Sequence, residues 1–191
     1  MPRRETKLAL GEHYHVYNRG NNRQPVCFER DNYLFLLKQW RKYVTPGCQV
    51  IAYCVMPTHY HFLVHIITDG FSHGMQLLGI SYTKAINKQR NRVGALFQGA
   101  FRAQHIERDE YLLHVSRYIH LNPVLIGLVQ RPEDWEFSSY RDYLGLRRGS
   151  LPVSDVVLGQ FATADAYRTF VESYAPADRQ DIAGLAFDND E

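Results

Sequence analysis

Long apolar runs are absent from this chain of 191 residues. A membrane-spanning helix needs about 20 consecutive apolar residues, and no stretch of the sequence comes near that length. The first residues, MPRRETKLALGEHYH, are basic but lack the apolar core of a secretory signal peptide. The sequence therefore predicts a protein of the cytoplasm that has no membrane as a partner.

Cysteine is scarce, and its three copies, at positions 27, 48 and 54, lack the paired spacing of metal ligands. An odd count with this spacing argues against a disulfide framework and against a cysteine zinc site, so we expect reduced, mostly buried thiols. A glycine-rich loop that could cradle nucleotide phosphates is also missing. The chemistry of the chain must therefore depend on other residue types.

Charge of both signs is present but unevenly divided. Residues 151–191 contain eight acidic and two basic residues, which leaves twenty basic and twelve acidic residues, a balance of +8, in residues 1–150. The basic residues cluster at 38–42, 83–92 and 146–149, near many of the tyrosines and phenylalanines. Basic residues interleaved with aromatic rings favour single-stranded nucleic acid as a partner. Solvated helix faces are the alternative explanation.

Hydrophobic periodicity predicts seven elements in the first 150 residues. Strands are indicated at 11–19, 48–55, 59–67 and 101–107, and helices at 29–44, at 72–92 and from 108 to just before Pro123. The order predicts an α+β fold: a ferredoxin-like or RRM-like antiparallel sheet with helices on one face. Residues 151–191 are expected to form an acidic C-terminal extension, partly helical or disordered.

Two histidines stand one residue apart in the apolar stretch VMPTHYHFLVH. Residues i and i+2 of a strand project from the same face, so His59 and His61 would point together and could provide two ligands of a metal site. A third ligand must come from elsewhere in the fold. The last predicted helix places Tyr118 and Asn122 one turn apart on one face, which could bring a phenol and an amide oxygen to the histidines.

The chain resembles the REP-associated tyrosine transposases, a branch of the HUH single-tyrosine transposases of bacterial insertion sequences. The resemblance is carried, between about residue 11 and about residue 146, by MPTHYHFLVH, LFQGAFRA, YLLHVSRYIHLNPV and RPEDWEFSSY. It implies that residues 1–150 form the transposase domain and that His59 and His61 bind a metal ion, Mg²⁺ or Mn²⁺. It also implies that Asn122 is the third ligand and that Tyr118 is the nucleophile.

The implied activity is the nicking and rejoining of single-stranded or hairpin DNA at repeat elements, through a 5′-phosphotyrosine intermediate, in the bacterial cytoplasm near the nucleoid. A free tyrosine has a pKa near 10 and is a poor nucleophile unless a metal ion or a base assists it. Whether the protein acts as a monomer or a homodimer is left open. Predicted DNA contacts, for which solvated charge is the alternative, are Arg19, Arg23, Lys84 and Arg102.

Other residues leave alternatives open. His13 and His15 repeat the His-x-His spacing and are interpreted as core residues or residues that face DNA. Tyr111 is the alternative nucleophile. His114 and His120 flank the predicted site, and His114 could replace the helical amide as a ligand or accept a proton. Two other functions also fit parts of the sequence: a DNA- or RNA-binding regulator that does not cleave, and a metallohydrolase with a water nucleophile, for which no carboxylate base stands near the histidines.

Overall fold

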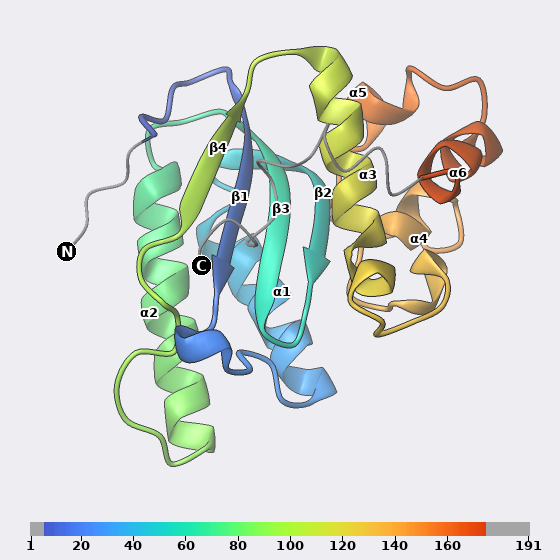
Figure 1. The fold of residues 1–191 in the computed structure, drawn as a ribbon. Helices are drawn as coiled ribbons and strands as arrows, with labels where there is room; N and C mark the ends of the chain where they lie inside the picture. The colour runs from blue at the N-terminus through green and yellow to red at the C-terminus, as the bar shows by residue number, and fades with distance from the viewer. Residues whose placement is uncertain (1–5, 175–191) are drawn as a thin grey trace.

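The computed structural model describes residues 6–174, without the side chains of residues 109 and 110. At its centre lies a four-stranded antiparallel sheet with the order β2-β3-β1-β4 (Figure 1). The strands are β1 (His13–Arg19), β2 (Cys48–Val55), β3 (His59–Ile66) and β4 (Arg102–Ile106). The helices are α1 (Arg30–Tyr43), α2 (Phe71–Gln89), α3 (Asp109–Leu125), α4 (Tyr140–Tyr143), α5 (Asp155–Leu158) and α6 (Ala164–Glu172), with 3₁₀ turns η1 (Asn21–Arg23) and η2 (Pro132–Asp134).

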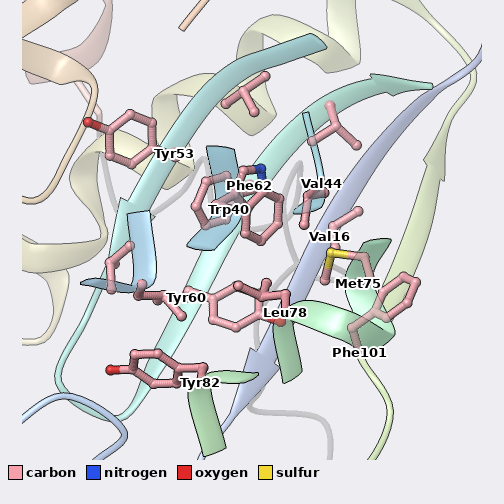
Figure 2. Packing of buried hydrophobic residues seen from close by; sticks show 14 of the residues in the cluster. Val16, Trp40, Val44, Tyr53, Tyr60, Phe62, Met75, Leu78, Tyr82 and Phe101 are labelled. Carbon is pink, nitrogen blue, oxygen red and sulfur yellow. The ribbon is translucent and has the colours of Figure 1, made fainter. Parts of the chain in front are cut away.

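One face of the sheet is buried under α1 and α2 (Figure 2). Successive strand residues point to opposite faces, so even-numbered residues of β1 and β3, such as Val16 and Phe62, face these two helices. Trp40 of α1 stacks on Phe62 with 3.4 Å between the ring centroids, and Leu78 of α2 joins the same cluster. Burial of these large apolar side chains stabilises both helices on the sheet.

The opposite face of the sheet carries the odd-numbered residues of β1 and β3 and is covered in part by α3. Leu63 of β3 packs with Val115 and Ile119 of α3 in a second cluster of buried residues. The α+β class, the antiparallel sheet and the helical layer of α1 and α2 are therefore confirmed. α3 lies outside that layer, because its apolar stripe packs on the face that carries Leu63 (Figure 1).

α3 continues through Pro123, so the predicted end before that proline is wrong. Pro123 lies in the last turn of the helix, where its missing N–H removes a single hydrogen bond. The helix ends instead at Leu125. Gly127, two residues later, has a φ of 73° in the left-handed region, and the N–H of Leu128 donates to the carbonyl of Pro123 at 2.9 Å. Asn122 consequently stays in helical register with Tyr118.

Residues beyond α3 return to the edge of β2 and to α3. Nε1 of Trp135 donates to the carbonyl of Val55 (3.0 Å), and the N–H of Ser139 donates to the carbonyl of Tyr53 (2.9 Å). These contacts cover the edge of the sheet. Helices α5 and α6, which belong to the predicted acidic extension, pack against α3. The rest of that extension, residues 175–191, lies outside the described residues, and the division at residue 150 stays a prediction.

The three cysteines are buried free thiols, as the sequence predicts. Burial raises the pKa of Cys27 and of Cys48 to about 12, so neither thiol is a reactive thiolate at neutral pH. Among the helices of residues 6–174, none is both long enough and apolar enough to cross a membrane.

Candidate active site

The predicted metal ligands of β3 and α3 lie side by side. His59, the first residue of β3, is half-buried, and its Nε2 lies 3.4 Å from Oδ1 of Asn122 on α3. Tyr118 precedes Asn122 by one helical turn and therefore projects from the same face of α3. The ring of Tyr118 meets the ring of His61 edge-on, with 5.5 Å between the centroids. The four residues thus meet between the beginning of β3 and the second half of α3.

An open pocket of about 210 Å³ lies at this meeting point. Two arginines predicted to contact DNA, Arg19 at the end of β1 and Arg23 in η1, form part of its wall. The other residues that line it are Thr58, His59, Tyr118, Asn122 and Ile126. Phenol, imidazole, amide and guanidinium groups therefore converge on one cavity.

The turn before β3 is bonded to the loop that carries the arginines. Oγ1 of Thr58 lies 2.9 Å from Nδ1 of His59, and the carbonyl of Thr58 accepts the N–H of Gly20 at 2.7 Å. A Cβ on Gly20 would lie 1.9 Å from the carbonyl oxygen of Gln24, so this tight turn requires glycine. These contacts place Arg23 beside the beginning of β3.

His61 is fully buried next to His15 of β1. Nδ1 of His61 lies 2.9 Å from Nε2 of His15, and the two rings stack with 5.0 Å between their centroids. Burial lowers the pKa of His15 to about 3. Burial, together with the neighbouring His59 and His15, holds the pKa of His61 well below its usual value. Both imidazoles are therefore neutral at physiological pH, the form that can ligate a cation.

The donor atoms fit a divalent cation. His59 and His61 offer imidazole nitrogens and Asn122 offers an amide oxygen, a mixed set that leaves positions for water or substrate. Two ligands about 2.1 Å from one ion, at an angle of about 90–110°, lie about 3.0–3.5 Å apart, and the 3.4 Å between His59 and Asn122 agrees with this. Among the described residues no three His, Cys, Asp or Glu side chains form a metal-binding group, and the donor that lies next to His59 at this point is the amide of Asn122.

Several residues predicted near the chemistry lie outside the pocket. Lys84 is exposed on α2, which covers the other face of the sheet, and Arg102 is exposed at the start of β4. Tyr111 is half-buried and packs against the cluster under α3. Nδ1 of His114 lies 3.0 Å from Nη2 of Arg117. None of these four residues is among the described residues that line the pocket.

The prediction that His120 flanks the site is wrong. Its side chain is fully buried, with Nδ1 2.7 Å from the hydroxyl of Tyr167 on α6 and Nε2 2.8 Å from Oγ of Ser139. Two residues along a helix turn the side chain by about 200°, so His120 faces the C-terminal segment while Tyr118 faces the sheet. Burial lowers the pKa of His120 to about 3, so it is a neutral core residue.

Sequence reasoning missed the contact of His15 and two residues of the pocket wall, Thr58 and Ile126. Of the two alternatives for His15, a core residue or a residue that faces DNA, its burial supports the first. Its contact with His61 depends on the register of β1 and β3, in which Tyr17 lies opposite His61. Alternation alone shows which residues share a face of one strand. It does not show which residues of two strands lie opposite each other.

Comparisons with known proteins show the family of this chain. The family described as "Transposase IS200 like" matches residues 10–122. A Haemophilus influenzae protein that carries the name of a REP-associated tyrosine transposase is 26% identical over 103 residues, which cover 48% of this chain and 58% of that protein. This chain therefore spans less than two thirds of that relative.

A solved structure has the same fold. It is that of a REP-associated tyrosine transposase bound to a REP hairpin, with a TM-score of 0.62 and 21% sequence identity. The likeness covers 76% of this chain and 86% of that one. The family match, which extends over more than half of the residues and ends at Asn122, shows that this chain belongs to the IS200-like transposases.

Proposed function

We propose that this chain is a divalent-cation-dependent endonuclease and strand transferase of single-stranded DNA, with Tyr118 as its nucleophile. The observation that carries the proposal is the meeting of Tyr118, His59 and Asn122 in one pocket. Membership of the IS200-like transposases supports this activity. The two arginines in the pocket wall provide the charge that a DNA backbone requires.

Tyr118 is held for attack on a phosphate. Its ring has edge-on contacts with His15 and His61, at 6.1 and 5.5 Å between centroids, and only 7% of the residue is exposed. A phenol fixed in this way loses little orientational freedom when a phosphate binds. Attack of its Oη on phosphorus forms a phosphotyrosyl bond to the 5′ phosphate and releases the 3′ oxygen, which takes up a proton. Because one ester replaces another, a 3′-OH can reverse the step and rejoin the strands.

His59, His61 and Asn122 are the residues that would hold the cation, Mg²⁺ or Mn²⁺. Bound there, the cation would polarise the scissile phosphate and stabilise the charge that develops in the transition state. Arg19 and Arg23 orient the phosphate groups on the wall of the pocket. Among the described residues that line the pocket none has a carboxylate, which favours tyrosine over a water molecule activated by a carboxylate base.

Hairpin-forming repeat DNA is the proposed substrate. The similar solved structure is that of a protein bound to a REP hairpin, and the balance of +8 in residues 1–150 attracts a polyanion. A hairpin with single-stranded flanks offers both a duplex backbone and bases that can stack on aromatic rings. Such a substrate would place the protein in the bacterial cytoplasm, at the nucleoid.

A denaturing gel tests the nucleophile. The full chain is incubated with Mn²⁺ and with 3′-end-labelled hairpin oligonucleotides that have randomised single-stranded flanks. We expect a labelled species that migrates with the protein, because the 5′ phosphate of the labelled fragment stays on the tyrosine. Tyr118→Phe should remove this adduct and leave DNA binding nearly intact, whereas Tyr111→Phe should retain it.

Three outcomes would contradict the proposal. An undiminished adduct in Tyr118→Phe would move the nucleophile to another residue. Hairpin binding with no adduct in the parent would identify a regulator that does not cleave. A free 5′ phosphate with no adduct would identify a hydrolase with a water nucleophile.

A further inference from the structure

His15 contacts both His61, a predicted metal ligand, and Tyr118, the predicted nucleophile. The proposed function gives His15 itself no role. It is fully buried on β1, with its Nε2 2.9 Å from Nδ1 of His61. Its ring also meets the ring of Tyr118 edge-on at 6.1 Å. The imidazole of His15 therefore packs at the back of the candidate active site, away from solvent.

The contact between His15 and His61 contains a single proton. A neutral imidazole has one N–H and one nitrogen lone pair, so one ring donates and the other accepts. If His15 donates from Nε2, the proton of His61 must be on its Nε2. If His61 donates from Nδ1, its Nε2 holds a lone pair. Only the second arrangement leaves His61 Nε2 available to a cation.

His59, the other predicted histidine ligand, also has a side chain in contact with its Nδ1. Nδ1 of His59 lies 2.9 Å from Oγ1 of Thr58, while its Nε2 faces Oδ1 of Asn122 at 3.4 Å. In both histidines Nδ1 is therefore in contact with a neighbouring side chain, and Nε2 is the nitrogen that would bind the cation. Metal-binding histidines commonly use the second ring nitrogen for a hydrogen bond that sets the tautomer and the ring orientation.

We propose that His15 is the positioning residue of His61: its Nε2 accepts the hydrogen bond of His61 Nδ1 and keeps His61 Nε2 unprotonated for a divalent cation. His15 has this role only if His61 is a cation ligand, as in the proposed function. In this arrangement the proton of His15 lies on Nδ1, which is buried and has no hydrogen-bond partner among the described residues. An unsatisfied buried N–H costs free energy, which an apolar side chain at this position would avoid. Packing alone therefore does not explain a histidine here.

Isothermal titration of the full chain with MnCl₂ tests the role, because it measures cation affinity without DNA or activity. His15→Phe keeps a ring of similar shape but removes the acceptor, and we expect the Kd for Mn²⁺ to rise about 10- to 100-fold. His15→Gln, whose amide oxygen can accept the hydrogen bond, should recover most of the affinity. His13→Phe is the matched control on the same face of β1, where His13 stacks on His65 instead, and it should bind Mn²⁺ like the parent.

The outcomes separate this role from the proposed function. A parent chain that does not bind Mn²⁺ would overturn the cation site and the role of His15 together. A parent that binds Mn²⁺, with a folded His15→Phe of equal affinity, would overturn the role of His15 alone.

If His15→Phe does not fold, long-range ¹H–¹⁵N spectra of the parent loaded with Zn²⁺ give the answer. We expect the proton of His61 on Nδ1, and a proton on Nε2 would overturn the role.

Discussion

The imidazole of His59 and the amide of Asn122 meet at 3.4 Å although 63 residues separate them in the chain. The contact exists because α3 packs on the same face of the sheet from which His59 projects, through Leu63, Val115 and Ile119. A nitrogen donor on a strand and an oxygen donor on a helix are thereby held at the spacing of two ligands of one cation.

Removal of the amide oxygen should weaken cation binding. Asn122→Leu keeps a similar volume but has no donor, and we expect the Kd for Mn²⁺ to rise by about tenfold or more, a loss of about 1.4 kcal/mol or more. Titration calorimetry measures this loss. His114→Leu is the control, because His114 lies beside Arg117 instead. A loss of affinity in His114→Leu, with none in Asn122→Leu, would make His114 the third ligand.

The arginines of the pocket should dominate the binding of phosphates. Arg23→Ala is expected to weaken the binding of single-stranded DNA and to reduce the slope of log K against log salt by about 0.7 for each phosphate that the variant no longer neutralises. Fluorescence anisotropy at several salt concentrations measures this slope. Lys84→Ala, which removes an exposed cation on α2, should change the slope less. Equal changes of this slope in the two variants would mean that DNA also binds along α2.

Acid should destabilise the fold through its buried histidines. Burial lowers the pKa of His120 to about 3, whereas an unfolded histidine titrates near 6.5. Below about pH 6.5 the unfolded chain binds a proton that the folded chain does not, so the free energy of unfolding falls as the pH falls toward about 3. The loss is at most about 1.4 kcal/mol per pH unit for this one group.

Urea unfolding at about pH 7.5, 6 and 4.5 measures this dependence. His120→Gln keeps polar groups that can reach Tyr167 and Ser139 but does not titrate, so its stability should fall less steeply with acid. If the free energy of unfolding of His120→Gln fell with pH as steeply as that of the parent, His120 would not titrate as its burial predicts.

The hydroxyl of Tyr167 should stabilise the packing of α6 on α3. It lies 2.7 Å from Nδ1 of His120 and 3.2 Å from Oγ of Ser116. Tyr167→Phe keeps the ring but removes the hydroxyl that these two buried groups share, and we expect a loss of about 1–3 kcal/mol in the free energy of unfolding.

Tyr140→Phe is the control for Tyr167→Phe, because it removes a single, partly buried hydrogen bond to Glu172. It should cost less, about 0.5–1.5 kcal/mol. Denaturant unfolding of both variants gives the comparison. A Tyr167→Phe variant as stable as the parent would show that apolar contacts alone hold α6.

Much of the fold could be predicted from local patterns. Local residue patterns predicted the four strands, by alternation at 11–19 and by β-branched and aromatic residues at 48–55, the range that β2 occupies. The predicted end of α3 before Pro123 is wrong, because a proline in the last turn of a helix costs little, and the helix ends at Leu125, just before the left-handed Gly127. The burial of His120 was missed, because its partners, Tyr167 and Ser139, lie in segments whose position no local pattern indicates.

Short-range periodicity in the sequence was sufficient to place His59 and His61 on one face of a strand, and Tyr118 and Asn122 on one face of a helix, since the geometry of each element repeats over two to four residues. Whether those two faces meet depends on the packing of α3 on the sheet, and the contact of His15 with His61 depends on the register of β1 and β3. Both are set by burial summed over many distant side chains, which no local pattern contains.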